Sequence, residues 1–266
     1  MPDRYAVIGN PVAHTKSPWI HAQFARATGE DIDYGCVEAP LDGFARAVEA
    51  FRAQGGKGLN VTLPFKLQAF RFCAGTSERA AAAQSVNTLL LDRGKPWGDN
   101  TDGVGLVRDL SANLGRSLAG ARILLMGAGG AAQGVLAPLA QAGAAGIVVA
   151  NRTLPRAQAL AARVPGARAC GYEALAGQSF DLVVNATSSG LGGDLPPLPH
   201  GLFRPGGFAY EMAYGLDTPF LAMARAAGAA ASDGLGMLVE QAAESFLLWR
   251  GIRPETGPVL AALRAK

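Results

Sequence analysis

The sequence predicts an α/β protein of two domains, because strand and helix patterns alternate along most of the chain. Short apolar runs that end in Gly, Pro or Asn are each followed by a segment with apolar residues at helical spacing. A glycine-rich turn, Gly127 to Gly130, joins one such apolar run to a helix pattern. This alternation is typical of right-handed parallel βαβ units.

The composition is that of a globular protein. The chain has 266 residues, enough for one large domain or two modest ones, and 49% of them are hydrophobic while 17% are charged. A net charge of +3 without a basic run argues against a nucleic-acid partner. No apolar stretch is long enough to span a membrane, and the first ten residues lack the apolar core of a signal peptide.

The three cysteines, Cys36, Cys73 and Cys170, are widely separated and show no CxxC spacing. This pattern argues against a disulfide framework and against a metal site. Reduced thiols in a cytoplasmic protein are the expectation. His14 and His21 are interpreted as structural or solvated residues, since His21 lies within a helix pattern.

The first hundred residues begin with a short strand that ends at Gly9-Asn10-Pro11. Ser17-Pro18 then predicts a helix start, with a capping hydroxyl followed by proline at the first helical position. The expected elements of this block are a strand at 5–8, a helix at 17–29, a strand at 34–37, a helix at 41–54, a strand at 59–63, and a hairpin of 86–91 with Trp97.

The second block repeats the alternation. Its expected elements are a connecting helix at 103–114, strands at 122–126, 147–150, 180–185 and 208–212, and helices after Gly130, at 156–164 and at 219–227. The tail, 236–266, is predicted to be helical. It contains no further strand pattern, so we expect it to pack on the first block.

Gly127-Ala128-Gly129-Gly130-Ala131-Ala132 fits the GxGxxG/A fingerprint of dinucleotide-binding folds. Glycine allows the sharp turn and the close approach of a pyrophosphate, and the N-terminus of the following helix offers free N–H groups to it. A lone glycine-rich turn is weak support. The apolar strand before it and the helix pattern after it strengthen the prediction.

The end of the next strand predicts which dinucleotide binds. NAD-binding folds place Asp or Glu there to bind the ribose hydroxyls. Here the strand ends in Asn151-Arg152-Thr153, and Arg156 follows. Two arginines without a carboxylate can neutralise a 2′-phosphate, which favours NADP, although arginines at a helix start are also often simply solvated.

Two polar segments suggest a catalytic pair. Asn60 to Lys66 follows one strand, and Gly98 to Gly103 precedes the second block. If the two blocks face each other, Lys66 and Asp102 can meet, and a lysine oriented by a carboxylate can give a proton to a carbonyl oxygen. From spacing alone a lysine after a strand is more often a solvated residue.

Together these segments resemble the shikimate dehydrogenase family over nearly the whole chain. The matching segments are GNPVAHTKSP (9–18), NVTLPFK (60–66), SVNTL (85–89), GDNTDGVG (98–105), GAGGAA (127–132), NRT (151–153), NATSSG (185–190) and DGLGMLVEQAA (233–243). They keep the family's order and spacing. The resemblance implies NADP-dependent reduction of 3-dehydroshikimate to shikimate, in the pathway to the aromatic amino acids.

The resemblance also implies a separate role for each domain. Residues 1–102 plus 236–266 would form the substrate-binding domain, and 103–235 a Rossmann-type NADP-binding domain. Lys66 and Asp102 would be the acid–base pair. The implied substrate-binding residues are Thr15, Ser17, Thr62, Lys66, Asn87, Asp102, Tyr214 and Gln241. The implied NADP-binding residues are Glu78, Gly127, Ala128, Gly129, Gly130, Ala131, Asn151, Arg152, Thr153, Arg156, Met212 and Gly234.

One residue departs from the family's pattern. Thr15 stands where members commonly carry serine, which keeps the hydroxyl and adds a methyl group. Related enzymes that use quinate vary hydroxyls in this loop, so a quinate or quinate/shikimate dehydrogenase using NAD is one alternative. A regulatory sensor that kept the fold without the chemistry is another. The expected protein is a cytoplasmic monomer or homodimer with small-molecule ligands, no metal and no membrane or nucleic-acid partner.

Overall fold

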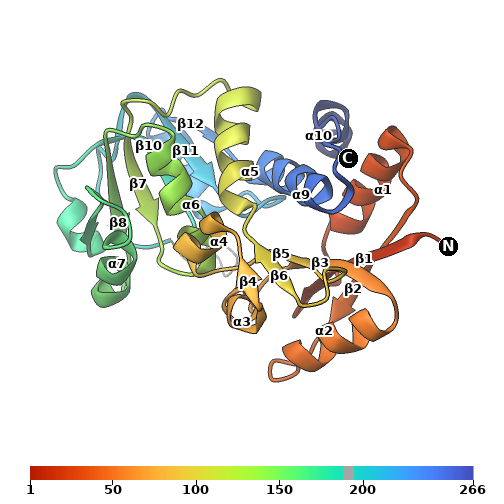
Figure 1. Cartoon of the computed structure of the whole chain (residues 1–266). Coiled ribbons are helices and arrows are strands. Elements are labelled where there is room, and N and C mark those ends of the chain that lie inside the picture. Colours follow the sequence, from red (N-terminus) through yellow and green to blue (C-terminus); the bar gives the residue numbers. More distant parts are fainter. Residues whose placement is uncertain (188–194, 266) are drawn as a thin grey trace. The chain divides into compact units, whose positions relative to one another are not determined.

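The computed structural model describes residues 1–187 and 195–265 and divides the chain into two compact units. The first unit comprises Met1–Gly105 and Leu238–Lys266, and the second comprises Leu106–Met237. Figure 1 follows the chain by colour from one terminus to the other. The sequence placed the corresponding boundaries after residue 102 and before residue 236.

The first unit contains a six-stranded mixed sheet in the order β2-β1-β3-β5-β6-β4. Its strands are β1 (Asp3–Gly9), β2 (Ile32–Glu38), β3 (Gly56–Val61), β4 (Gly75–Thr76), β5 (Thr88–Leu90) and β6 (Trp97–Asp99). β1 runs parallel to β2 and β3, whereas β5 runs antiparallel to both β3 and β6. The predicted hairpin is therefore present as β5 and β6.

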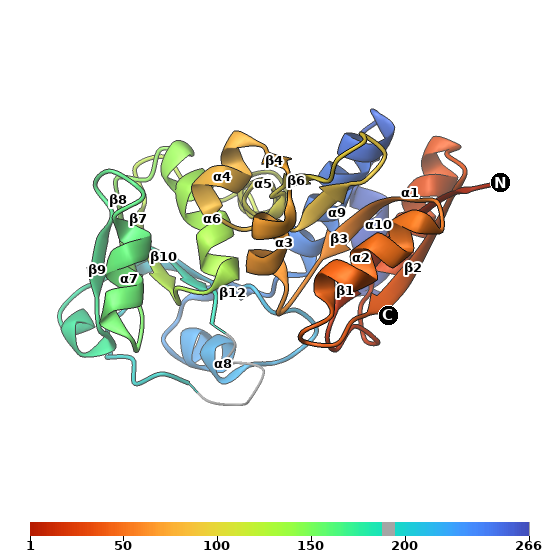
Figure 2. The same ribbon diagram turned by 60° about the horizontal axis from the view of Figure 1, so that its bottom comes forward.

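Helices cover both faces of this sheet (Figure 2). They are α1 (Ser17–Thr28), α2 (Phe44–Ala53), α3 (Lys66–Phe72), α4 (Glu78–Ala83), the start of α5 (Asp102–Arg108), most of α9 (Leu235–Arg250), and α10 (Gly257–Arg264). Alternate strand residues face opposite sides. Ile8 packs in one core with Phe44 of α2. Tyr5, three residues earlier in the strand, faces the other side and stacks on Trp249 of α9.

The predicted cap of α1 is wrong in its detail. The N-cap residue is Lys16, and no side chain caps the helix. The Ser17 backbone N–H instead donates to the Thr15 hydroxyl oxygen at 3.2 Å. The Ser17 hydroxyl therefore does not cap this helix.

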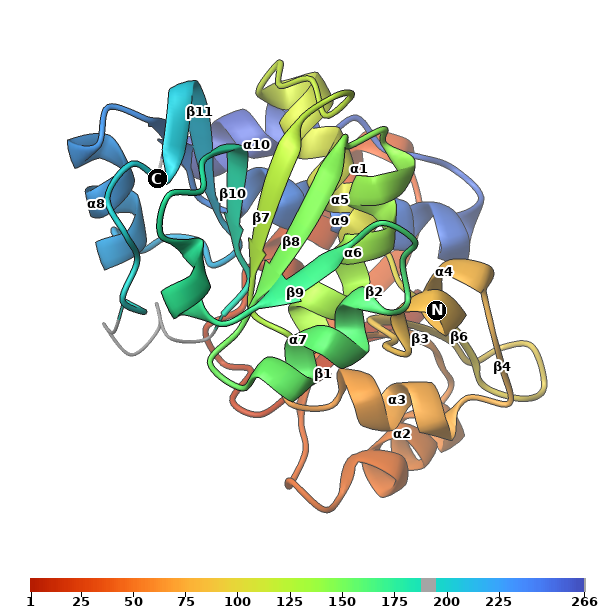
Figure 3. The same ribbon diagram turned by 90° about the vertical axis from the view of Figure 1, so that its left-hand side faces the viewer.

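The second unit contains a six-stranded parallel sheet in the order β12-β11-β10-β7-β8-β9. Its strands are β7 (Arg122–Met126), β8 (Gly146–Ala150), β9 (Arg168–Cys170), β10 (Phe180–Asn185), β11 (Phe203–Glu211) and β12 (Ala230–Ser232). Figure 3 looks onto these strands. Counted within the unit, this is the Rossmann order: successive strands are added on one side from β7 to β9 and on the other side from β10 to β12.

Helices pack on both faces of this second sheet. They are α6 (Gly130–Gln141), α7 (Leu154–Ala161) and α8 (Pro219–Ala226), with a π-helical turn at Asp109–Asn113 and a 3-10 turn at Tyr172–Leu175. Leu125 of β7 shares a core with α6, and its neighbour Leu124 shares another with α8. Buried residues therefore face both ways along β7, as expected for a parallel sheet.

Candidate functional site

Lys66 and Asp102 form an ion pair within the first unit. Lys66 is the first residue of α3, and Asp102 is the first residue of α5. Lys66 Nζ lies 2.6 Å from Asp102 Oδ2, and their side chains are only 15% and 6% exposed. The pairing expected from chemistry is present, but it lies inside one unit and does not depend on two blocks facing each other.

Asn87 holds the second oxygen of that carboxylate. Asn87 Nδ2 donates to Asp102 Oδ1 at 2.9 Å, while Asn87 Oδ1 accepts from the Thr101 backbone N–H at 2.8 Å. A carboxylate only accepts and a backbone N–H only donates, so both contacts require the same orientation of the amide. Asp102 therefore presents Oδ2 to Lys66 in a set direction.

Gln241 of α9 reaches the same group from the other end of the chain. Gln241 Oε1 accepts from Asn87 Nδ2 at 3.3 Å, and Gln241 Nε2 donates to the Leu238 carbonyl at 2.8 Å. One turn later Ser245, which is fully buried, donates to the Gln241 carbonyl at 3.0 Å. Four predicted residues, Lys66, Asn87, Asp102 and Gln241, therefore form one hydrogen-bonded group.

Thr15 and Thr62 lie on two adjoining loops of the first unit, and Ser17 is the first residue of α1. Thr15 Oγ1 donates to Ser17 Oγ at 3.1 Å. The loop after β1 is tied to the turn after β3 by a hydrogen bond from the Asn10 N–H to the Leu63 carbonyl, 3.0 Å. A Cβ at Gly9 would lie 2.5 Å from Thr62 Cγ2, so glycine is required there for Thr62 to hold its place.

The glycine-rich turn of the second unit has the geometry that a dinucleotide needs. Gly127 has φ +105°, a conformation that residues with a Cβ avoid. Gly129 precedes α6 in an extended conformation, and no side chain caps that helix. A Cβ at Gly129 would meet nothing within 4 Å. The space beside Gly129, just before the first turn of α6, is therefore open, which suits a pyrophosphate.

The residues after β8 form an exposed turn that carries two arginines. Arg152, Thr153 and Arg156 are exposed, and Asn151 Nδ2 donates to the Thr153 carbonyl at 3.0 Å, which shapes the turn. No Asp or Glu lies between Asn151 and Arg156. Two exposed cations without a competing carboxylate are suited to an anion.

A buried carboxylate, Glu211, organises the loop that carries Met212 and Tyr214. Glu211 is fully buried at the end of β11, and its oxygens accept from Asn185 Nδ2 at 2.7 Å and from the Ala213 N–H at 3.2 Å. Burial raises the pKa of Glu211. Sequence reasoning missed this residue, although a single carboxylate in the apolar run FAYEM was a signal for it.

Gly234 lies against the same loop. A Cβ at Gly234 would approach the Met212 carbonyl oxygen to 2.3 Å, and the Gly234 N–H donates to the Ala213 carbonyl at 3.0 Å. Next to it, Asp233 Oδ2 accepts from the Gly215 N–H at 2.9 Å. Met212, Tyr214 and Gly234 are therefore brought to one end of the second unit's sheet.

Comparison with known proteins matches three family models along the chain. They are the shikimate dehydrogenase substrate binding domain over residues 7–89, shikimate / quinate 5-dehydrogenase over 109–191, and the shikimate 5′-dehydrogenase C-terminal domain over 234–264. A shikimate dehydrogenase (NADP(+)) of Nitrosospira multiformis is 57% identical over 100% of this chain and 98% of its own. The chain belongs to the shikimate dehydrogenase family.

Solved structures agree with this family assignment. An Ael1 enzyme from Pseudomonas putida superposes with a TM-score of 0.92 at 51% identity, covering 98% of each chain. Shikimate 5-dehydrogenase from Thermus thermophilus, in complex with NADP(H) and shikimate, gives a TM-score of 0.88 at 36% identity over 99% of each chain. The predicted α/β fold with a Rossmann-type domain is confirmed.

Two residues that the family resemblance singled out lie in a different unit from the rest of their set. Glu78 lies in the first turn of α4, in the first unit, while the other predicted NADP residues lie in the second. Tyr214 also lies in the second unit, whereas the other predicted substrate residues lie in the first. In the segment 185–190, residues from 188 onward are outside the described part of the chain.

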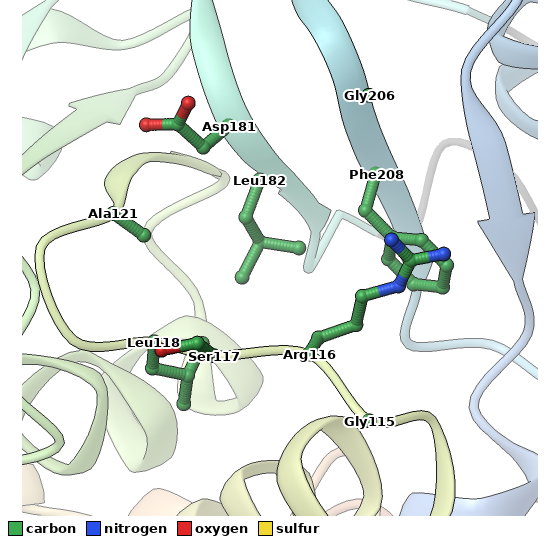
Figure 4. Close-up of a pocket in the computed structure, with 9 residues that line it drawn as sticks. All are labelled: Gly115, Arg116, Ser117, Leu118, Ala121, Asp181, Leu182, Gly206 and Phe208. Atoms are coloured by element: carbon green, nitrogen blue, oxygen red, sulfur yellow. The ribbon is translucent and has the colours of Figure 1, made fainter.

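A pocket of about 210 Å³ in the second unit lies away from these family residues (Figure 4). It opens near the starts of β7 and β10, and the Arg116 guanidinium stands 4.5 Å above the Phe208 ring on its wall. Open parallel sheets bind ligands at the opposite edge, where strands end. None of the predicted site residues lines this pocket.

Among the described residues, no helix has both the length and the apolar character to cross a membrane. Within residues 1–187 and 195–265, no group of three or more His, Cys, Asp or Glu side chains is arranged to hold a metal ion.

Proposed function

We propose that this chain is an NADP-dependent shikimate dehydrogenase, which reduces the ketone of 3-dehydroshikimate to the alcohol of shikimate and catalyses the reverse reaction. It would act in the pathway to chorismate and the aromatic amino acids. The observation that carries the proposal is the buried Lys66–Asp102 pair, held by Asn87, in a chain that matches such enzymes over its whole length.

Lys66 is the proposed proton carrier. Bound NADPH supplies the hydride that reduces the carbonyl carbon. As negative charge grows on the carbonyl oxygen, the Lys66 ammonium donates a proton to it, and in the reverse direction the amine accepts a proton from the alcohol. Asp102, 2.6 Å away, directs the ammonium and balances its charge. Asn87 keeps that carboxylate from turning.

The substrate's carboxylate and hydroxyls suit the remaining polar groups. Thr15, Ser17 and Thr62 offer hydroxyls that both donate and accept, while Asn87 and Gln241 offer amides. A substrate lacking one hydroxyl would leave such a group unpaired, which is a strong basis for selectivity. Tyr214 of the second unit remains a proposed substrate residue from the family pattern.

For NADP, the proposed contacts are of two kinds. Backbone groups of Gly127 to Ala131 and the start of α6 would hold the pyrophosphate, and Asn151 to Arg156 would hold the 2′-phosphate. Met212 and Gly234 would lie by the nicotinamide, and Glu78 is a further proposed contact. The cytoplasmic location and the monomeric or homodimeric state stay predictions.

The test is steady-state oxidation of shikimate, followed by nicotinamide absorbance, with NADP⁺ or NAD⁺ and with quinate as the rival substrate. We expect shikimate with NADP⁺ to be the preferred pair. Lys66→Ala should lower kcat by about 10²–10⁴-fold while circular dichroism shows an intact fold. Lys57→Ala is the matched control, because Lys57 pairs with Asp3 at the surface and should keep full activity.

Two outcomes would contradict the proposal. Preference for quinate with NAD⁺ would make the chain a quinate-using relative. No turnover with any of the four pairs would favour a protein that kept the fold without the chemistry.

A further inference from the structure

Arg79 of α4 forms a two-point ion pair with Asp99, the last residue of β6. Arg79 Nε donates to Asp99 Oδ1 at 2.7 Å, and Arg79 Nη2 donates to Asp99 Oδ2 at 2.9 Å. The Asp99 side chain is only 6% exposed and that of Arg79 is 28% exposed. Two parallel N–H donors on a planar guanidinium fix the plane of a carboxylate. Asp99 is therefore held in both position and orientation.

The carboxylate of Asp99 in turn holds the segment that leads to Asp102. Asp99 Oδ1 accepts from the Asn100 backbone N–H at 2.6 Å, and Asn100 Oδ1 accepts from the Asp102 backbone N–H at 3.1 Å. The Asp99 carbonyl accepts from the Asn87 backbone N–H at 3.0 Å, and Asn87 Nδ2 donates to Asp102 Oδ1 at 2.9 Å. Two short series of hydrogen bonds thus connect Asp99 with Asp102, the partner of Lys66.

The third nitrogen of the Arg79 guanidinium reaches α9, where a second arginine offers a comparison. Arg79 Nη1 donates to Glu244 Oε1 at 3.0 Å, and Arg253 Nη1 donates to Glu244 Oε2 at 3.1 Å. Arg253 Nη2 also lies 2.6 Å from Glu240 Oε2, in a side chain that is 4% exposed. Each arginine therefore binds one nearly buried carboxylate and shares Glu244 with the other. Asp99 leads to the proposed catalytic aspartate, whereas Glu240 lies on α9.

We propose that Arg79 is a positioning residue for the reduction, which acts through Asp99 to set the direction of the Asp102 carboxylate. The inference rests on the proposed function, because Asp102 belongs to the proposed catalytic pair. Arg79 takes no part in the proton transfer assigned to Lys66. A carboxylate that turns more freely directs the ammonium less well, and a small misplacement of a catalytic group slows the chemical step. Loss of Arg79 should therefore lower kcat.

The experiment compares Arg79→Met and Arg253→Met with the wild type, using shikimate and NADP⁺. Methionine keeps part of the apolar stem and removes the guanidinium in both cases. We expect kcat of Arg79→Met to fall about ten- to a hundredfold. The kcat of Arg253→Met should stay within about twofold of the wild type. Thermal unfolding should show a similar loss of stability in the two variants, because each leaves one nearly buried carboxylate without its arginine.

Arg79→Lys separates the charge of the side chain from its geometry. Lysine keeps the positive charge and a long apolar stem, so this variant should fold. It no longer offers two parallel N–H donors to Asp99. We expect its kcat to lie between those of the wild type and Arg79→Met. Wild-type kcat in Arg79→Lys would show that charge alone suffices, and the positioning role would be lost.

A double-mutant cycle with Asp99→Asn tests the route of the effect. If Arg79 acts through Asp99, Arg79→Met should lower kcat much less in the Asp99→Asn background than in the wild type. Full additivity, equal kcat in Arg79→Met and Arg253→Met, or a raised KM for NADP⁺ with wild-type kcat would each overturn the inference. If the wild type fails to turn over shikimate, the proposed function fails instead, so the two failures are distinguishable.

Discussion

Asp102 is surrounded by groups that satisfy both of its oxygens. Lys66 donates to Asp102 Oδ2, and Asn87 donates to Asp102 Oδ1. The Asp102 backbone N–H donates to Asn100 Oδ1 at 3.1 Å. Such a carboxylate cannot turn away from the ammonium without losing a hydrogen bond. At the residue scale, the proposed catalytic pair is therefore set up before any ligand arrives, which is the arrangement that preorganised catalysis requires.

His21 should make the protein sensitive to acid. Burial lowers its pKa to about 3 in the folded protein, while an unfolded chain takes up the proton near pH 6.5. The stability that the neutral ring contributes is present above pH 6.5 and is lost as the pH falls toward 3. Between pH 7 and pH 5 we expect the free energy of unfolding to fall by about 2 kcal/mol from this residue.

Urea unfolding of wild type and His21→Phe at the two pH values measures this loss. The variant keeps an aromatic ring beside Tyr34, so the difference between the two slopes isolates the titration of His21. Equal slopes would show that the imidazole reaches water in the folded state.

The Lys66–Asp102 ion pair could be predicted from sequence, but its surroundings could not. Lys66 and Asp102 belong to motifs that the family resemblance identified, and their chemistry is complementary. Tyr34, Asn60 and Ser245 meet only because three strands and α9 bring together residues separated by 26 and 185 positions. No local pattern marks a hydroxyl or an amide as buried beside another, so these contacts needed the structure.

In the turn between β7 and α6, two glycines are present for different reasons. Gly127 has φ +105°, and a Cβ there would lie 3.0 Å from the Ala186 carbonyl oxygen. Gly129 has an ordinary φ of −84° and open space around the position of a Cβ. The first glycine is required by the fold, while the second leaves the space before α6 open.

Alanine at each position should therefore have different consequences. Gly127→Ala should cost about 1–3 kcal/mol of unfolding free energy, because the backbone is strained for an L-residue. Gly129→Ala should leave stability within about 0.5 kcal/mol of wild type and weaken NADP⁺ binding, because its methyl group occupies the space above the helix N-terminus. Urea unfolding and titration calorimetry measure the two effects. Wild-type NADP⁺ affinity in Gly129→Ala would contradict a pyrophosphate at this turn.

Long periodic elements were predictable and short edge strands were not. Strands β7 and β10 occupy the expected residues, and α1 ends where Gly29 takes a left-handed conformation. The strands β9 and β12 have three residues each at the two edges of their sheet, too short to show a periodic pattern. The helix expected at 41–54 begins only at Phe44, since Leu41 is exposed.

The hydrophobic cores of the molecule are divided between the two units. One core surrounds β1 and β3, and two others cover the faces of β7. All three tryptophans, Trp19, Trp97 and Trp249, belong to the first unit. Their fluorescence therefore reports on that unit alone, while far-ultraviolet circular dichroism reports on both.

Saturating NADP⁺ should separate the two signals during thermal unfolding. A ligand at about 100 times its Kd stabilises the unit that binds it by about 2.7 kcal/mol. We expect the transition seen by circular dichroism to broaden and extend to higher temperature, while the tryptophan transition stays in place. A tryptophan transition that moves with the ligand to the same extent would show that the two units unfold as one.

The order of the chain has a consequence for synthesis on the ribosome. The second unit is one continuous segment, so it is complete once Met237 has emerged. The first unit waits for α9, which brings Gln241 to Asn87 and Trp249 to Tyr5. Domains fold as units when their residues become available. A nascent chain thus gains its nucleotide fold first, and a message truncated just before the codon for Gln241 would encode that fold without a finished substrate domain.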